Sequence, residues 1–184
     1  MTVHVVATII LVGWVVFWVY WLAAAISAKP GRARWGRFAG ARVALLLIVL
    51  LLVRAKVFKG QTITDDPWLE GVGLAVFASG LALAVWARVY LGRNWGTPMS
   101  EKVDAELVTT GPYHRVRHPI YSGIILAMVG TAVAVSWYWL IAAGLITVYF
   151  VYSAFMEERY MTGLFPDAYP AYRRSTKMLI PFVF

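Results

Sequence analysis

Long apolar stretches dominate this sequence, and they restrict the folds open to it more than any other feature does. The first, residues 5–28, contains no charge and is longer than the ~20 residues that a helix needs to cross a bilayer. Further apolar stretches cover residues 38–57 and 68–89, and a charge-free run at residues 119–156 is long enough for a tight helical hairpin. The sequence therefore predicts an all-α integral membrane protein with five transmembrane helices, of which the last two form the hairpin.

The composition supports this class of protein and excludes several kinds of site. Hydrophobic residues make up 61% of the chain and charged residues only 14%, against roughly 25% in ordinary soluble domains. The absence of cysteine excludes disulfides, a cysteine nucleophile and thiolate metal sites, and the three histidines lack metal-ligand spacing, so we expect no metal. The net charge of +8 comes from short segments beside apolar stretches, which favours contact with membrane lipids over nucleic acid.

The distribution of lysine and arginine predicts the orientation of the chain. Most of these residues lie in segments 29–37, 88–117 and 159–177, whereas Lys56 and Lys59 lie on the opposite side. The positive-inside rule then places the N-terminus outside, and the C-terminus and the active site in the cytoplasm. The sequence LAAAISA at the end of the first stretch resembles a signal-peptidase site, but no Lys or Arg precedes this long run, so we expect it to be retained.

We expect a single membrane domain over residues 1–184. Residues 1–91 would contain three N-terminal spans, and residues 92–184 a catalytic part with a cofactor-binding segment, the helical hairpin and a cytoplasmic amphipathic tail. The tail, residues 157–184, carries Glu, Arg, Tyr and Pro and is too polar to cross the bilayer.

Polar residues concentrate in GPYHRVRHPIYSG, residues 111–123, at the start of the hairpin. Pro119 after His118 suits the first turn of a helix, because proline lacks the amide proton that would have no partner there. Free amides, the positive end of the helix dipole and the guanidinium of Arg117 together favour binding of a carboxylate or phosphate. The alternative is that Arg117, His118 and Tyr121 are interfacial anchors in contact with lipid headgroups.

A pair of carboxylates, Glu157 and Glu158, follows the hairpin directly. Like charges at the negative C-terminal end of a helix cost stability, and residues that break a local rule often serve function. The pair could hold an ammonium or sulfonium group, or Arg159 and Arg173 could neutralise it without a catalytic role. Because a hairpin returns to the side where it began, we expect the pair beside residues 117–121, in one cytoplasmic site suited to a zwitterion.

Two tyrosines in the tail, Tyr169 and Tyr172, share one helix face and could line an adenine pocket or lie in the interface. The segments LVTTGPYHRVRHPIYSG and EERYMTGLFPDAYPAYRR, with the apolar hairpin between them, resemble the isoprenylcysteine carboxyl methyltransferase family in its shorter prokaryotic form. The shared signature is Arg-His-Pro-x-Tyr, a hydrophobic stretch, Glu-Glu and Tyr-x-x-Tyr. The resemblance covers residues 95–181, nearly half of the chain, and the first three spans match only in being hydrophobic.

The resemblance implies that S-adenosylmethionine binds on the cytosolic side beneath the hairpin, and that a lipophilic acceptor enters laterally from the bilayer. The implied cofactor contacts are Ala105, Glu106, Leu107, Val108, Tyr113, His118, Pro119, Ile120, Tyr121 and Glu157, and the implied catalytic residues are Arg117, His118 and Glu158. Ser153 stands where members that methylate prenylcysteine have an arginine, so recognition of a prenylcysteine carboxylate does not carry over to this chain.

We therefore predict an S-adenosylmethionine-dependent membrane methyltransferase that acts on a lipophilic small molecule, with a carboxylate as the favoured acceptor. Alignment of acceptor and activated methyl group can lower the barrier by roughly 7–11 kcal/mol. A carboxylate needs no general base, whereas an ammonium group must first lose a proton, for which Glu158 and His118 are candidates. The alternatives are a phospholipid amine N-methyltransferase, an NADPH-dependent membrane reductase of the sterol reductase type and, least favoured, a non-enzymatic membrane scaffold.

Overall fold

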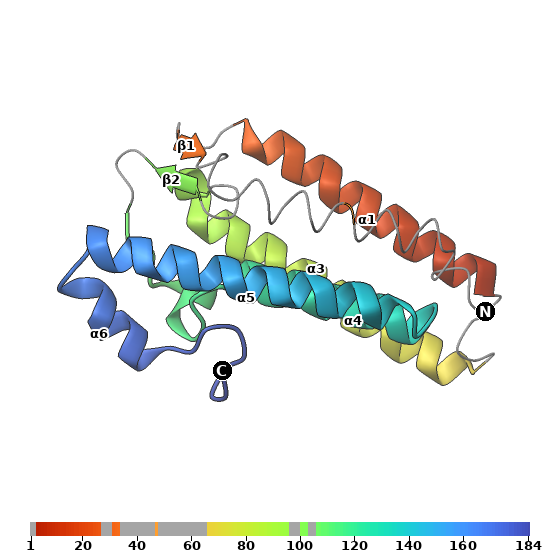
Figure 1. Cartoon of the computed structure of the whole chain (residues 1–184). Coiled ribbons are helices and arrows are strands. Elements are labelled where there is room, and N and C mark those ends of the chain that lie inside the picture. Colours follow the sequence, from red (N-terminus) through yellow and green to blue (C-terminus); the bar gives the residue numbers. More distant parts are fainter. Residues whose placement is uncertain (1–2, 27–30, 34–46, 48–65, 96–99, 103–105) are drawn as a thin grey trace.

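The computed structural model describes residues 3–26, 31–33, 47, 66–95, 100–102 and 106–184 (Figure 1). Its helices are α1 (Val3–Ala25), α3 (Pro67–Leu91), α4 (Pro119–Ala134), α5 (Trp139–Leu164) and α6 (Ala168–Ser175), with short 3₁₀ helices η2 (Gly92–Asn94) and η3 (Gly111–His114). Two strands of three residues, β1 (Gly31–Ala33) and β2 (Ser100–Lys102), pair antiparallel. The described part of the chain is thus helical, as predicted, apart from a strand pair too short to leave a recognisable sequence pattern.

Among the residues that the structure describes, three helices are long and apolar enough to cross a membrane, in agreement with the prediction of an integral membrane protein. They are Val5–Ala25, Pro67–Asn94 and Trp139–Leu164. The apolar helix α4 has 16 residues, or about 24 Å at 1.5 Å per residue, which is less than the ~30 Å hydrocarbon core. Of the second predicted span, residues 38–57, the structure describes only Leu47, so the number of five spans stays a prediction.

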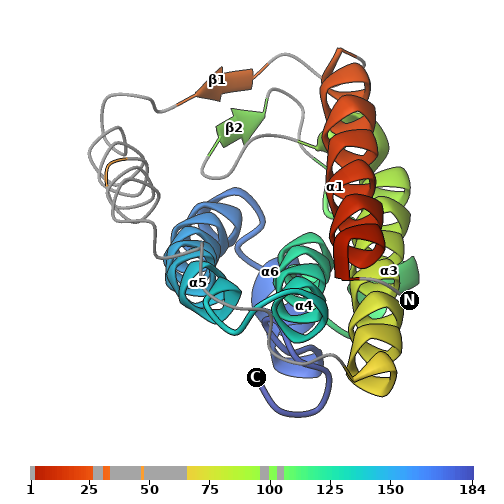
Figure 2. The same ribbon diagram turned by 90° about the vertical axis from the view of Figure 1, so that its right-hand side faces the viewer.

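The helices α3 and α4 approach each other closely because glycines face each other along their contact. Gly73 and Gly80 lie seven residues apart on α3, as do Gly123 and Gly130 on α4. A Cβ atom added to Gly80 would lie 2.6 Å from the carbonyl oxygen of Gly123, and one added to Gly130 would lie 2.7 Å from that of Gly73. Small residues of this kind allow close backbone packing between helices in membranes. In the view of Figure 2, α4 lies between α3 and α5.

A buried arginine joins the ends of α1 and α3. Arg88 donates a hydrogen bond from Nη2 to the carbonyl oxygen of Ala24 and another from Nη1 to that of Gly92, both at 2.6 Å. Both residues lie at the C-terminal ends of these helices, where the last carbonyl groups are open to bonds from side chains. The guanidinium carbon also lies 4.7 Å from the ring centre of Trp95, so the arginine fixes the position of that indole.

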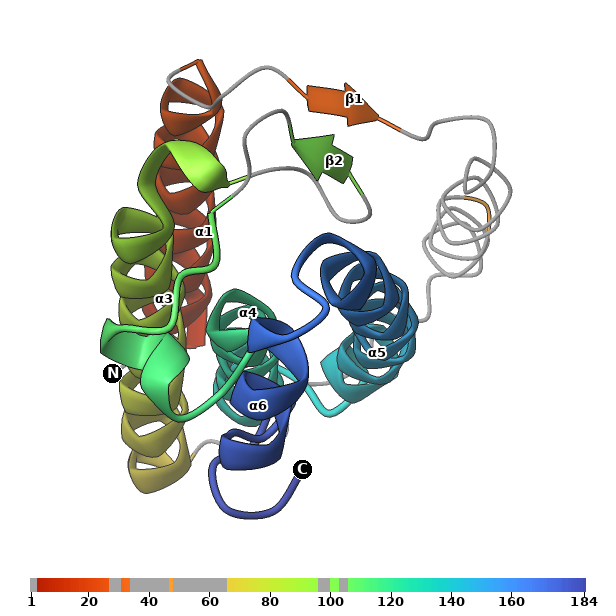
Figure 3. The same cartoon turned by 90° about the vertical axis from the view of Figure 1, so that its left-hand side faces the viewer.

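The C-terminal tail lies against the chain just before α4. The amides of Arg117 and His118 donate to the carbonyl oxygens of Lys177, at 2.8 Å, and Met178, at 3.1 Å. Figure 3 shows α6, which precedes this segment, across the near end of α4. The backbone of the Arg-His-Pro motif is therefore held by residues some sixty positions later in the sequence, which orients its side chains.

The glutamate pair lies within α5 and not at its end, which corrects the sequence analysis. The helix continues to Leu164, so residues 157–164, which we assigned to the tail, extend the hairpin by about two turns. The reason is that the charges have partners: Arg117 Nε donates to Oε1 of Glu158 at 2.7 Å. Paired carboxylates do not end a helix, and the expected repulsion is compensated.

Candidate functional site

A cavity of about 470 Å³ opens between the C-terminal ends of α1 and α3, the first turns of α4, and helices α5 and α6. Its size is within the ~300–1,000 Å³ typical of small-molecule sites. The cavity is lined by most of the predicted site residues: Glu106, Leu107, Val108, Tyr113, Arg117, His118, Ile120, Tyr121 and Glu157. Pro119 and Glu158 are buried but do not line it, and Ala105 lies outside the described residues.

The apolar part of the lining comes largely from residues that carry no motif. Helix α1 contributes Trp18, Trp21, Leu22 and Ala25, which have the i, i+3, i+4, i+7 spacing of one helix face. Trp95 and Phe150 complete the aromatic wall. The sequence analysis missed these residues, because the same spacing occurs on any packed membrane helix and nothing in it distinguishes a ligand cavity from helix packing.

Arg117 and Glu158 form a buried ion pair that connects three segments. Besides its bond to Glu158, Arg117 donates from Nη1 to the carbonyl oxygens of Arg173, at 3.2 Å, and Thr176, at 2.6 Å. Glu158 also lies 3.2 Å from Nε of Arg173 and 3.4 Å from Nε2 of His118, and its side chain is only 3% exposed. The pair therefore ties α5, the start of α4 and the tail to one another.

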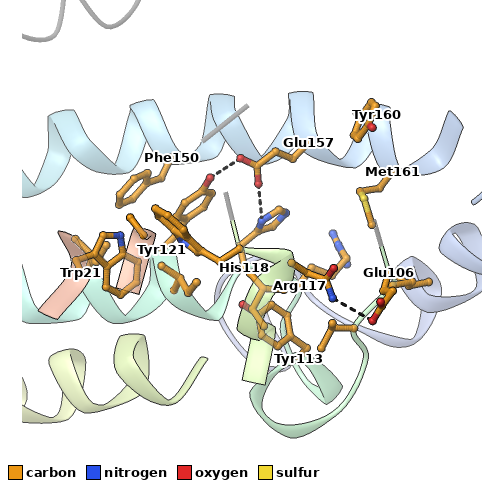
Figure 4. Close-up of a pocket in the computed structure, with 18 of the residues that line it drawn as sticks. Trp21, Glu106, Tyr113, Arg117, His118, Tyr121, Phe150, Glu157, Tyr160 and Met161 are labelled. Carbon is orange, nitrogen blue, oxygen red and sulfur yellow. Dashed lines mark hydrogen bonds and ion pairs between the residues drawn. The ribbon is translucent and has the colours of Figure 1, made fainter. Parts of the chain in front are cut away.

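The neighbouring glutamate has different surroundings and faces the cavity. Glu157 accepts a hydrogen bond from the Tyr121 hydroxyl at 2.5 Å, and its other oxygen lies 3.5 Å from Nδ1 of His118. Its side chain is 25% exposed, against 3% for that of Glu158. Figure 4 shows Glu157 pointing from α5 toward both partners. Successive helix residues point about 100° apart, which explains why one carboxylate meets the arginines and the other meets the cavity.

A stack of three rings crosses the cavity wall from its polar part to its apolar part. The His118 and Tyr121 rings are 5.4 Å apart and nearly parallel, and those of Tyr121 and Phe150 are 4.3 Å apart with an interplanar angle of 6°. Rings held on both faces have little freedom to rotate. The position of the Tyr121 hydroxyl is thus fixed by packing as well as by its bond to Glu157.

Three tyrosines line the cavity where η3 and α6 meet: Tyr113 and Tyr169, which are buried, and Tyr172, which is half-buried. The Tyr172 hydroxyl donates to the carbonyl oxygen of Tyr113 at 2.6 Å, and the Tyr169 ring packs edge-on against that of Tyr172. Burial raises the pKa of all three phenols above the usual value, because the charged phenolate loses hydration there. They are therefore neutral hydrogen-bonding aromatic groups at physiological pH.

The pKa of His118 is also raised. Burial by itself lowers the pKa of an imidazole, but hydrogen bonds and charge attraction from Glu157 and Glu158 outweigh it here. The folded protein consequently holds a proton on His118 at pH values where an unfolded histidine, with a pKa of about 6.5, has lost it.

This raised pKa predicts how stability depends on pH. The contribution of protonated His118 is complete below about pH 6.5 and is lost as the pH rises through the higher pKa of the folded state. We expect the difference in melting temperature between wild type and His118→Gln, measured in detergent, to be larger at about pH 6 than at about pH 9. His114→Gln, at an exposed position, is the control, and a His118→Gln difference that does not change with pH would contradict the prediction.

Comparison with known proteins relates this chain to a family of enzymes. A family model described as phospholipid methyltransferase matches residues 68–168. A nickel-cobalt-cadmium resistance protein of Alcaligenes xylosoxydans xylosoxydans and a cobalt-zinc-cadmium resistance protein of Cupriavidus metallidurans are 28% and 27% identical over 143 residues, 76% of this chain. The chain spans 64% and 63% of their lengths, less than two thirds. Among the residues that the structure describes, no group of three or more His, Asp or Glu side chains is placed to hold a metal ion.

Two further similarities concern methyltransferases. Methanethiol S-methyltransferase 1 of Bradyrhizobium diazoefficiens is 40% identical over 70 residues, which are 38% of this chain and 24% of that protein. The solved structure of the eukaryotic intramembrane Ras methyltransferase, an isoprenylcysteine carboxyl methyltransferase, has a TM-score of 0.59 and 23% sequence identity. That likeness covers 83% of this chain and 55% of the other, and it establishes a common fold.

Proposed function

The chain belongs to the phospholipid methyltransferase family, and we propose that it transfers the methyl group of S-adenosylmethionine to a lipophilic small molecule. One observation carries the proposal. The carboxylate of Glu157, held by Tyr121 and His118, lies at the polar end of a cavity whose other end is lined by aromatic residues of membrane helices. A cation from the cytoplasm and an apolar molecule from the bilayer can meet in such a cavity.

The residues present fit S-adenosylmethionine, which carries a sulfonium and an ammonium group. Glu106 and Glu157 supply negative charge to the lining, and the rings of Tyr113, Tyr169 and Tyr172 offer faces for a cation or an adenine ring. When bound, the cofactor supplies a methyl group already activated by the positive sulfur. These carboxylates also count against the reductase alternative, because they would repel the phosphates of NADPH.

The protein's own contribution is orientation and exclusion of water. The stacked Tyr121 and Phe150 rings and the indoles of Trp21 and Trp95 enclose the apolar end of the cavity. Holding two reactants in line in this way is worth up to roughly 7–11 kcal/mol. The acceptor would enter from the bilayer beside α1 and α5, and the active site would face the cytoplasm, as the positive-inside rule predicts.

Two candidate functions differ in the chemical group of the acceptor that receives the methyl. The sequence favours a carboxylate as the group that receives the methyl, and Arg117 would be the cation that binds it. Arg117, however, already donates hydrogen bonds to Glu158 and to two backbone carbonyl groups. That engagement favours an acceptor with no negative charge, such as an amine or a thiol. The family description and the similarity to a methanethiol S-methyltransferase support the same second candidate.

The proposal predicts that the purified protein binds S-adenosylhomocysteine and that Glu157→Gln weakens this binding. Loss of a charge-assisted contact of ~1.5–3 kcal/mol corresponds to a dissociation constant roughly 10–150 times higher. The measurement is calorimetric titration in detergent with added lipid. Asp167→Asn, which removes an exposed negative charge away from the cavity lining, is the matched control and should bind like wild type.

Two results would count against the proposal. If folded wild-type protein bound NADPH and not S-adenosylhomocysteine, the reductase reading would replace it. If neither ligand bound, the non-enzymatic scaffold would be the better interpretation.

A further inference from the structure

We propose that Tyr121 and Glu157 together accept the proton of an acceptor whose nucleophilic atom is protonated at neutral pH, of which a thiol is the simplest case. This inference rests on the methyl transfer proposed above. It assigns Tyr121 a catalytic role, whereas the sequence analysis gave it only cofactor contact and named Glu158 and His118 as candidate bases.

The geometry of Tyr121 and Glu157 suits the transfer of a proton between them. The Tyr121 hydroxyl donates to Oε1 of Glu157 at 2.5 Å, and both side chains line the cavity. A proton that arrives on the tyrosine oxygen can therefore be balanced by transfer of the phenol's own proton to Glu157. The second carboxylate oxygen, 3.5 Å from Nδ1 of His118, continues this chain toward the polar end of the cavity.

The position of Tyr121 in the cavity suits contact with the reacting group of the acceptor. Tyr121 lies where the lining changes from polar to apolar: His118 stacks on one face of its ring and Phe150 on the other. A lipophilic acceptor with its apolar part among the aromatic residues would present its reacting atom at this boundary. Figure 4 shows the Tyr121 ring beside Phe150, with its hydroxyl directed toward Glu157.

Glu158, one of the two bases named from the sequence, is poorly placed to receive this proton. Glu158 is 3% exposed, does not line the cavity, and is paired with Arg117 at 2.7 Å and Arg173 at 3.2 Å. A carboxylate held by two guanidinium groups is a weak base. Glu158 is therefore a positioning residue, which keeps Arg117 and the tail in place, and Glu157 is the carboxylate that can receive a proton.

The step balances in atoms and charge. For an acceptor R–SH, the S–H bond breaks, its proton passes to the Tyr121 oxygen, and the phenolic proton passes to Glu157. A new bond forms between the acceptor sulfur and the methyl carbon, while the methyl–sulfonium bond breaks and leaves its electron pair on the donor sulfur. The positive charge of the donor and the negative charge of Glu157 disappear together, so no uncompensated charge forms in an enclosed cavity.

The groups that act on the Tyr121 hydroxyl come from each neighbouring element: His118 before α4, Tyr113 in η3, and Glu157 and Tyr149 in α5. Of these groups, Glu157 is the only carboxylate. It is the group that makes proton transfer through Tyr121 favourable.

The test is Tyr121→Phe, which keeps the ring stack and removes the hydroxyl, compared with Tyr138→Phe at an exposed position as control. The acceptors are phenylmethanethiol, protonated at neutral pH, and thiophenol, of similar size but largely ionised. We expect Tyr121→Phe to bind S-adenosylhomocysteine within about tenfold of wild type, since one neutral hydroxyl is lost. Its rate with phenylmethanethiol should fall roughly 100-fold, the usual scale of general base catalysis, and its rate with thiophenol should fall far less.

The pH profile gives an independent readout. With phenylmethanethiol, the rate of Tyr121→Phe should rise about tenfold per pH unit below the pKa of the thiol, because only thiolate reacts, and wild type should show a flatter profile.

Equal losses with both thiols and an unchanged profile would overturn the proposal, as would loss of S-adenosylhomocysteine binding in Tyr121→Phe. Wild type that binds S-adenosylhomocysteine but methylates neither thiol would overturn the acceptor class and leave the methyltransferase proposal intact. Absence of binding by wild type would instead refute that earlier proposal.

Discussion

Replacing Gly80 by leucine is expected to prevent assembly of the helix pair α3 and α4 and so to abolish recovery of folded protein. A Cβ at Gly80 would lie 2.6 Å from the carbonyl oxygen of Gly123 and 2.8 Å from the Cα of Ala127, and it would press against the amide nitrogen of Ala127. Those contacts are with backbone, which cannot move aside as a flexible side chain can. Overpacking usually costs ~1–3 kcal/mol, and a displacement of two whole helices should exceed that range.

The membrane makes this contact more important. Lipid chains are as apolar as leucine, so helices gain little from the hydrophobic effect when they associate within the bilayer, and close backbone packing has to hold them together. The loss should appear as a lower yield of monodisperse detergent-solubilised protein and as loss of the cooperative thermal transition.

Gly71→Leu is the matched control, because it places the same side chain on the same helix at a position where a Cβ meets nothing within 4 Å. Its yield and melting temperature should stay close to those of wild type. A Gly80→Leu protein that melted like the Gly71→Leu protein would show that α3 and α4 do not depend on this contact.

Arg117→Met is expected to lower the free energy of unfolding by about 3 kcal/mol, the lower end of the range for breaking a buried ion pair. The variant leaves Glu158 buried and without its 2.7 Å partner, and it frees the carbonyl oxygens of Arg173 and Thr176. Arg173, at 3.2 Å, and His118 remain near the carboxylate, so the loss should not reach the upper end.

A double-mutant cycle separates the ion pair from other effects of the substitution. Equilibrium unfolding in mixed micelles should show Arg117→Met/Glu158→Leu to be more stable than the sum of the two single changes predicts, because the double variant leaves no unpaired buried charge. Arg115→Met, two residues away and exposed, is the control and should unfold like wild type. Strict additivity of the two single changes would mean that the pair contributes no specific coupling.

The sequence alone determined the long membrane helices that the structure describes, because the bilayer imposes a simple rule. A helix that crosses the hydrocarbon core needs a long apolar run, and the runs at residues 5–28, 68–89 and 119–156 contain most of α1, most of α3, and the hairpin of α4 and most of α5. Hairpin geometry also brought residues 117–121 to the glutamate pair, since consecutive antiparallel helices return to one side. Both inferences depend only on the number of residues between two segments, and that number can be read from the sequence.

Only the tertiary structure decided which of the two glutamates faces the cavity and which one forms the buried ion pair. Glu157 and Glu158 are equivalent in the sequence, and the rotation of α5 directs the first to Tyr121 and His118 and the second to Arg117. Helix α1 likewise offers several apolar faces, and packing against α3 selects the one with Trp18 and Trp21 for the cavity. The backbone hydrogen bonds between residues 117–118 and 177–178 also could not be predicted from the sequence. In each case the choice depends on the angle at which distant segments meet, and local patterns of residues do not encode that angle.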